Sequence, residues 1–165
     1  ILDMTATPPM ILRPGAITQE MLEELIGEVA VDRSTISADS RESPKAPGMK
    51  YRHYAPQADL SVVEGPMELA IEAINRMAAG RIAEGYKVGI IATDETAGRY
   101  RGGIIKSIGP RADEATIASR LYGILREFDN EGADYILSES FSTCGIGSAV
   151  MNRLLKAASH HIIDV

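Results

Sequence analysis

The sequence has a single cysteine, Cys144, and no long apolar run. One cysteine excludes an internal disulfide and is typical of a reducing compartment. A membrane span needs roughly 18 consecutive apolar residues, and neither such a run nor a signal-peptide pattern is present. We therefore expect a cytoplasmic protein that does not enter a membrane.

The chain also lacks an initiating methionine, and its first residues, ILDMT, have the pattern of a buried strand. We expect from this that the 165 residues are a piece of a longer protein, entered within a domain. Hydrophobic residues make up 45% and charged residues 24% of the sequence, which is typical of a globular protein and not of a disordered one.

The net charge of −6 is unevenly spread. Residues 1–32 carry six acids and one base, Arg13, whereas residues 33–58 carry five bases and two acids. An acidic protein with one short basic segment is a poor general binder of nucleic acid, although such a segment can attract a small anion.

Residues 1–32 have the pattern of strand, turn, strand and short helix. Thr18 is a suitable N-cap for the helix and Gly27 a suitable stop. The apolar stripe of this helix consists of Met21, Leu22, Leu25 and Ile26. These elements make only a partial core, as expected for the tail of a truncated domain. Residues 33–58 lack periodicity, and a segment of that length without regular structure indicates a linker or a functional loop.

From residue 59 onward, strands and helices alternate, which predicts an α/β fold with a parallel, loosely Rossmann-like sheet and right-handed crossovers. The strands are expected at 60–65, 87–93, 103–109, 134–139 and 161–165. One helix is expected from Pro66 to about Glu84, with Leu69, Ala70, Ala73, Ile74 and Met77 buried. A second is expected to bury Ile117, Leu121, Ile124, Leu125 and Phe128, and a third Val150, Met151, Leu154 and Leu155.

Two segments of this second domain follow strands, at the edge where ligands bind in open α/β sheets. The segment GIGSAV (145–150) can cradle an anion at a helix N-terminus, or can simply be a tight turn with close helix packing. The segment 92–103 supplies polar side chains that can contact a ligand or face solvent. These are Asp94, Glu95, Thr96, Arg99 and Arg101. No metal-binding pattern emerges around His160 and His161, and no histidine signature makes Cys144 a catalytic thiol.

Arg13 stands between an apolar strand and a Pro-Gly turn, in ILRPG. A lone arginine at a strand end is placed to bind a phosphate or carboxylate through two hydrogen bonds. The alternative is a structural ion pair with one of the six acids of its segment, and the pattern alone does not separate the two.

The segment KAPGMKYRHYAP (45–56) has the prolines and glycine of a loop but carries Lys50, Tyr51, Arg52, His53 and Tyr54 within five residues. These side chains can bind a ligand, or they can dock the linker on a domain surface, where tyrosine and arginine are favoured in any case.

Together, ILRPGAIT and APGMKYRHYAP resemble the two-domain threonylcarbamoyladenylate synthases of the YrdC family. The segments RADEATIASRLYGILREFDNEGADYILSE and GIGSAVMNRLLKAA are similar to that family's smaller second domain. The resemblance covers nearly the whole chain. It implies that 1–32 are the tail of a YrdC-like domain, 33–58 an interdomain linker or lid, and 59–165 a complete Rossmann-like C-terminal domain.

The resemblance further implies a reaction of ATP, L-threonine and bicarbonate that makes threonylcarbamoyl-AMP and releases pyrophosphate, with Mg²⁺ accompanying ATP. A partner complex would then transfer the threonylcarbamoyl group to a tRNA adenosine. Arg13 matches the family arginine that binds the nucleotide phosphate. Tyr54 is favoured as the tyrosine that approaches the nucleotide, with Lys50, Tyr51, Arg52 and His53 as further lid residues that help to exclude water.

The family's signature lysine, arginine, threonine and serine positions would lie upstream of Ile1, so the catalytic residues are unknown here and the fragment alone is expected to be inactive. Two alternatives remain. The second domain can be a module that binds RNA or a protein, for which a stripe of Arg99, Arg101, Lys106 and Arg111 would be suited, or it can be purely structural and only anchor the lid.

Overall fold

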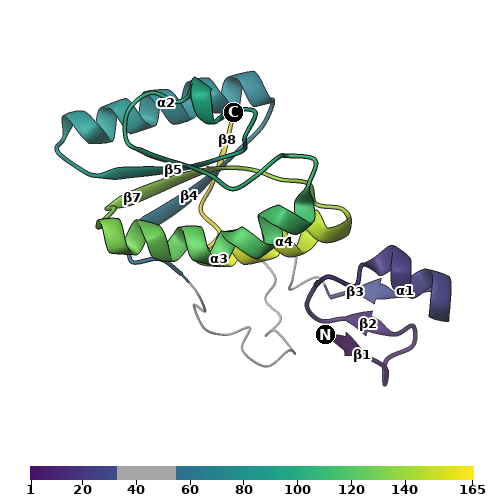
Figure 1. The fold of residues 1–165 in the computed structure, drawn as a ribbon. Helices are drawn as coiled ribbons and strands as arrows, with labels where there is room; N and C mark the ends of the chain where they lie inside the picture. Colours follow the sequence, from purple (N-terminus) through teal and green to yellow (C-terminus); the bar gives the residue numbers. More distant parts are fainter. Residues whose placement is uncertain (33–54) are drawn as a thin grey trace.

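The computed structural model describes residues 1–32 and 55–165. The first range forms a small unit with a three-stranded sheet, and the second forms a larger unit around a five-stranded sheet (Figure 1). In these described residues, no helix is both long and apolar enough to cross a bilayer.

The N-terminal unit contains three two-residue strands and one helix. They are β1 (Leu2–Asp3), β2 (Met10–Ile11), α1 (Gln19–Ile26) and β3 (Ala30–Val31). Strand β2 pairs antiparallel with β1 and parallel with β3. The predicted cap is present, because Thr18 Oγ1 accepts a hydrogen bond from the Met21 N–H at 3.4 Å. Gly27, with φ of 81°, ends the helix in a conformation that suits glycine.

The apolar side of α1 is not covered. No residue of this helix is buried, and Leu25 is 82% exposed, with Met21 and Ile26 also exposed. Of the four residues of the predicted stripe, only Leu22 is partly buried in the described chain. Strand β3, which pairs in parallel with β2, was not predicted from the sequence.

The larger unit confirms the predicted α/β class. Its strands are β4 (Asp59–Glu64), β5 (Val88–Ala92), β6 (Ile104–Ser107), β7 (Tyr135–Glu139) and β8 (Ile162–Asp164). The sheet order is β6-β5-β7-β4-β8, and every neighbouring pair is parallel. Strand β5 is buried along its whole length, as its continuous apolar run predicts for a strand covered on both faces.

Helices cover both faces of this sheet (Figure 1). They are α2 (Met67–Ala83), the short 3₁₀ helix η2 (Ala97–Arg99), α3 (Glu114–Glu131) and α4 (Gly145–Ala157). One core lies between the sheet and α2, and the other between the sheet and the pair α3 and α4. The helices α2, α3 and α4 each bury an apolar face, and a sheet with two apolar faces is the stable partner for them.

The five α3 residues predicted to be buried are all buried, and Phe128 has no exposed area. The prediction for α2 was wrong at Leu69, which is 48% exposed, whereas Ile71 is buried in its place. The stripe of α2 is rich in alanine and is therefore wide, so the helical period alone does not fix its edges.

Candidate functional site

Arg13 lies just after β2, in the loop that turns toward α1. Its backbone carbonyl accepts a hydrogen bond of 2.8 Å from the amino group of Ile1, and its side chain is exposed. Within residues 1–32 and 55–165 the guanidinium forms no ion pair, so the structural pairing considered as an alternative is not found there. Binding of a nucleotide phosphate by Arg13 stays a prediction.

A cavity of about 370 Å³ lies next to Arg13, where the N-terminal unit meets α4. Pro14, Gly15 and Thr18 line it from one side, and Ser148 and Leu155 from the other. We call it the junction cavity. The helices α1 and α4 both begin at its wall, since their N-caps, Thr18 and Cys144, are lining residues.

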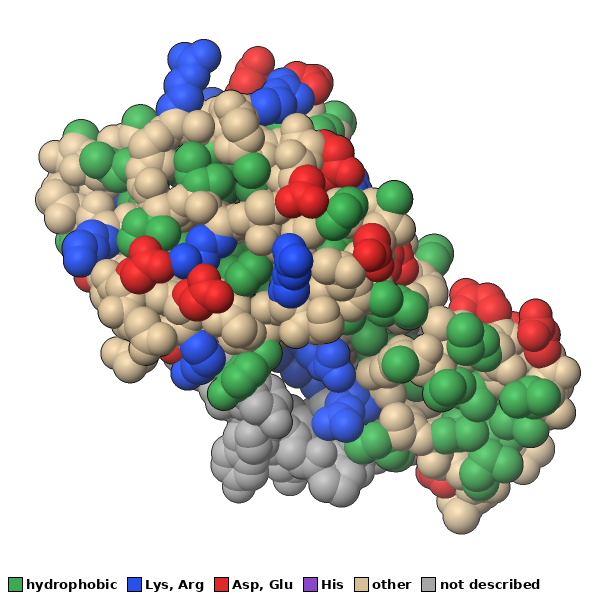
Figure 2. Space-filling view, viewed as in Figure 1, with side chains coloured by type: hydrophobic (Ala, Val, Ile, Leu, Met, Phe, Trp, Pro, Cys, Tyr) green, Lys and Arg blue, Asp and Glu red, His purple; other side chains and the backbone are tan. Residues whose placement is uncertain are grey.

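Cations gather near this cavity. Figure 2 shows Lys and Arg side chains where the larger unit meets the N-terminal one. Partial burial, and then the charge of Arg13, lowers the pKa of the Lys156 ammonium at the end of α4. Burial, and then the charge of Lys156, lowers the pKa of His160. The charge of Arg13 thus acts on the ammonium of Lys156, and the charge of Lys156 acts on the imidazole of His160.

The predicted lid residues lie outside the described chain. Neither Tyr54 nor its neighbours Lys50, Tyr51, Arg52 and His53 can be placed, and their roles stay predictions. The end of the linker is described and is attached to α3. The Ala55 carbonyl accepts a 2.8 Å hydrogen bond from Arg126 Nη2, and the Gln57 N–H donates to Asp129 Oδ1 at 2.7 Å.

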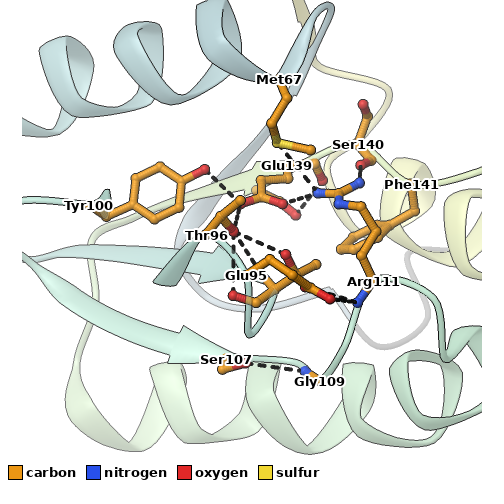
Figure 3. Close-up of polar contacts among 12 residues, drawn as sticks. Met67, Glu95, Thr96, Tyr100, Ser107, Gly109, Arg111, Glu139, Ser140 and Phe141 are labelled. Carbon is orange, nitrogen blue, oxygen red and sulfur yellow. Dashed lines mark hydrogen bonds and ion pairs between the residues drawn. The ribbon is translucent and has the colours of Figure 1, made fainter. Parts of the chain in front are cut away.

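A second polar site lies at the carboxyl ends of β5 and β7. These strands are neighbours, but the chain leaves β5 toward the β6 edge and leaves β7 toward the β8 edge. Such a change of direction opens a crevice in doubly wound folds. Here Glu139 ends β7 and is only 1% exposed. Its Oε1 accepts hydrogen bonds from Thr96 Oγ1 and from the Tyr100 hydroxyl (2.7 Å), and its Oε2 forms an ion pair with Arg111 (Figure 3).

Arg111 connects this site to the loops around it. Its Nη1 donates to the Ser140 carbonyl at 3.1 Å, its backbone N–H donates to the Glu95 carboxylate at 3.0 Å, and its guanidinium lies 5.6 Å from the centre of the Phe141 ring (Figure 3). Burial, and then the hydrogen bond to Glu139, raises the pKa of the Tyr100 hydroxyl. The Arg111–Glu139 ion pair thus lies at this change of direction, and a cavity of about 220 Å³ beside it is lined by Arg111, Phe141 and Gly147.

The residues predicted to meet a ligand in segment 92–103 separate in the structure. Glu95 and Thr96 join the crevice, whereas Arg99 pairs with Glu68 of α2, its Nη1 donating to Oε1 at 2.8 Å. Asp94 accepts a hydrogen bond from Ser107. The sequence analysis did not single out Glu139 or Tyr100. An acid that ends an otherwise apolar strand was the available signal for Glu139, because a carboxylate there needs a buried partner.

The segment GIGSAV begins α4, and its predicted anion cradle already holds a carboxylate. The Gly147 N–H donates to Glu114 Oε2 at 2.8 Å. A Cβ atom on Gly147 would lie 2.5 Å from the Ser142 carbonyl oxygen, so the backbone approaches closely at this point. These contacts favour the interpretation as a tight turn with close packing.

Other candidates are accounted for by the described contacts. Lys106 pairs with Glu127 and Glu131 at 2.8 and 2.6 Å, so three of the four cations of the proposed RNA stripe are held in ion pairs. His161 Nδ1 lies 2.9 Å from Ser61 Oγ. Over residues 1–32 and 55–165, no group of three or more His, Cys, Asp or Glu side chains could hold a metal ion.

Comparison with known proteins places this geometry in context. The family model described as "Threonylcarbamoyl-AMP synthase, C-terminal domain" matches residues 17–159. The threonylcarbamoyl-AMP synthase of Bacillus subtilis is 44% identical over 155 residues, which cover 94% of this chain and 43% of the relative. That of Pyrococcus abyssi is 41% identical over 165 residues, covering 100% of this chain and 46% of the relative. The chain thus spans less than half the length of these relatives.

Solved structures agree with the sequence matches. The crystal structure of P. abyssi Sua5 complexed with L-threonine superposes with a TM-score of 0.85 at 38% identity and covers 99% of this chain and 46% of that one. A variant of the same protein, in which a histidine and the adjacent tyrosine are replaced by alanine, gives a TM-score of 0.86 at 38% identity, covering 99% and 45%. Both units are included in each superposition.

Proposed function

The chain belongs to the family of threonylcarbamoyl-AMP synthase C-terminal domains, and from this premise we propose that it supplies the lid and the accessory domain of such a synthase. The whole enzyme would join L-threonine, bicarbonate and the AMP part of ATP, with Mg²⁺ accompanying ATP. The observation that carries the proposal is the superposition of 99% of this chain on the L-threonine complex of P. abyssi Sua5.

The N-terminal unit has the properties of an incomplete domain. The apolar side of α1, with Leu25 82% exposed, has the character of a core surface, although a stable domain buries such a stripe. The relatives are more than twice as long as this chain. We infer that residues 1–32 complete a YrdC-like domain whose larger part, including the catalytic residues, belongs to the preceding half of the protein.

Within the complete enzyme, Arg13 would bind the nucleotide phosphate and Tyr54 would approach the nucleotide. The variant of P. abyssi Sua5 replaces an adjacent histidine and tyrosine, and this chain has one such pair, His53–Tyr54, within the predicted lid. The threonine amino nitrogen would bond to the bicarbonate carbon with loss of water, which gives N-carboxythreonine. A carbamate oxygen of this compound would attack the α-phosphorus of ATP, the bond from the α-phosphorus to the bridging oxygen would break, and pyrophosphate would leave. The product is a mixed anhydride that water destroys, which gives the lid a chemical role.

The second domain fits an anchor better than an RNA-binding module. The Arg111–Glu139 ion pair lies at its carboxyl edge, and three cations of the predicted RNA stripe are already paired. It also fastens the end of the linker through Arg126 and Asp129. Transfer of the product to tRNA would belong to a separate partner complex.

The decisive test is release of pyrophosphate that depends on both threonine and bicarbonate. The complete protein and this 165-residue chain should be assayed in parallel. We expect activity from the complete protein and none from the chain alone. A folded, ATP-binding complete protein that releases no pyrophosphate would refute the synthase proposal and favour a binding module.

The lid needs its own variant, Tyr54→Ala in the complete protein. We expect a shorter lifetime of threonylcarbamoyl-AMP and a lower rate of its formation. If both quantities matched the parent protein, the lid mechanism would be wrong even if the synthase activity stood.

A further inference from the structure

The cavity of about 220 Å³ beside the Arg111–Glu139 ion pair lies at the carboxyl edge of the five-stranded sheet, where ligands bind in open α/β folds. We call it the edge cavity. Its volume is below the range of about 300–1,000 Å³ that is usual for drug-sized ligands, so it suits a molecule of few heavy atoms. The segments that follow β6 and β7 and the first turns of α3 and α4 supply its polar lining. These residues are Arg111, Ser142, Glu114 and Gly147.

Two oxygen acceptors meet on the wall of the edge cavity, beside Gly147. The Ser142 carbonyl oxygen and Glu114 Oε1 lie 2.5 and 2.8 Å from the point where a Cβ atom on Gly147 would stand. Glu114 uses its other oxygen, Oε2, to accept the Gly147 N–H at 2.8 Å. Within residues 1–32 and 55–165, no N–H or O–H donates to Glu114 Oε1 or to the Ser142 carbonyl oxygen. Both acceptors are therefore available to a ligand that brings donors.

The charges at the edge cavity favour a cation. Of the described residues that line it, Arg111 is the only base and Glu114 the only acid. The Arg111 guanidinium is already paired with the buried Glu139 carboxylate (Figure 3). In the described ranges Glu114 forms no ion pair. The starts of the two neighbouring helices are capped by acids, α3 by Asp113 and α4 by Glu114 Oε2, so neither start calls for an anionic ligand.

The rest of the lining is apolar. Ile117 and Val150 are buried, and Phe141 is partly buried and packs against the same core. A short aliphatic chain can pack against these side chains, and a phenyl ring also attracts a cation. A carboxylate at this place would be repelled by Glu114 and Glu139.

We propose that the edge cavity binds a small aliphatic molecule that carries a primary ammonium group. The ammonium donates to Glu114 Oε1 and to the Ser142 carbonyl oxygen, and the first of these is a charge-assisted hydrogen bond. The aliphatic part packs against Ile117 and Val150. This inference concerns the second domain alone and goes beyond the proposed synthase function.

The first test is a calorimetric titration of the 165-residue chain with isobutylamine, and with isobutanol as the uncharged molecule of similar shape. We expect isobutylamine to bind with a Kd on the order of 1 mM, because so small a ligand makes few contacts. Isobutanol should bind roughly tenfold more weakly or worse, because it lacks the charge. Equal binding of the two, or no binding of isobutylamine, would overturn the proposal.

L-Valine adds a carboxylate to the carbon skeleton of isobutylamine. We expect it to bind more weakly than isobutylamine, because the carboxylates of Glu114 and Glu139 repel the added charge. Tighter binding of L-valine would overturn the assignment of a cationic ligand.

The variant Glu114→Gln removes the charge but keeps an oxygen that can accept the Gly147 N–H. We expect a loss of isobutylamine affinity of roughly tenfold or more. The matched control is Glu72→Gln, which removes one negative charge from α2, on the other face of the sheet, and should bind as the parent chain does. Thermal unfolding verifies that both variants fold. Equal affinities of Glu114→Gln and Glu72→Gln would overturn the proposal.

Amide NMR shifts locate the ligand in the unchanged chain and need no variant. Isobutylamine should shift the amide signals of Ser142 and Gly147, whereas those of Gly15 and Thr18, which line the junction cavity, should stay in place. Shifts confined to Gly15 and Thr18 would place the amine in the junction cavity and would overturn the proposal.

Discussion

At the scale of single residues, the second domain depends on one buried charge. Glu139 is almost fully buried, and its carboxylate is satisfied by Thr96, Tyr100 and Arg111, which come from loops that follow two other strands. A buried carboxylate is tolerated only when it is paired and hydrogen-bonded. The ion pair therefore ties together the loops at the carboxyl edge of the sheet.

Replacing Arg111 by methionine should leave the Glu139 carboxylate without its counter-charge. We expect the free energy of unfolding to fall on the order of 3 kcal/mol, measured by urea denaturation. The double variant Arg111→Met/Glu139→Gln should be less destabilised, because no uncompensated charge remains. Arg99→Met, which removes an exposed pair with Glu68, is the control and should change stability little. Equal effects of Arg111→Met and Arg99→Met would contradict this account.

At the scale of elements, the start of α4 is fixed by close backbone packing. Gly147 approaches the Ser142 carbonyl and the Glu114 carboxylate so closely that a side chain has no room. Gly123, in α3, has no neighbour within 4 Å of the position where a Cβ atom would stand. Close packing therefore excludes a side chain at Gly147, whereas the position of Gly123 has room for one.

Gly147→Ala should destabilise the chain by about 1–3 kcal/mol, because overpacking forces the backbone to shift. Gly123→Ala should instead stabilise it by about 0.5–1 kcal/mol, because alanine is the better helix former. Thermal and urea unfolding of both variants measure the difference. A shift of the same sign in both would mean that the close approach at Gly147 does not govern its stability.

At the scale of the whole molecule, the two units differ in completeness. The five-stranded sheet has a core on each face, whereas the N-terminal unit has only a small cluster around Leu12 and Met10. The exposed side of α1 is the observation behind our proposal that the N-terminal unit completes a larger domain.

The substitution Leu25→Lys tests whether a further domain covers α1 in the complete protein. In the 165-residue chain, the substitution should raise solubility and leave the unfolding of the larger unit unchanged, because Leu25 packs against nothing. In the complete protein it should cost about 2 kcal/mol, since a leucine that is buried there would be lost. Leu69→Lys, on an exposed position of α2, is the control and should be tolerated in both contexts. Tolerance of Leu25→Lys in the complete protein would argue against the inferred partner domain.

The sequence by itself determined the local elements of this protein. The helical period of apolar residues predicted α3 and its buried face. The continuous apolar run that ends at Ala92 predicted β5 as a strand buried on both faces, and Thr18 predicted the start of α1. Each of these depends on residues within a few positions of one another, where periodicity and capping act directly.

Only the tertiary structure decided which distant residues meet. The sheet order β6-β5-β7-β4-β8 brings Glu139 to Thr96 and Arg111, and tertiary packing brings Arg126 and Asp129 of α3 to the end of the linker. The sequence analysis did not single out Glu139 or Tyr100, and it placed Leu69 on the wrong side of α2. Strand pairing and packing between units join positions that no local period relates, so they follow from the burial of the whole chain and not from any one segment.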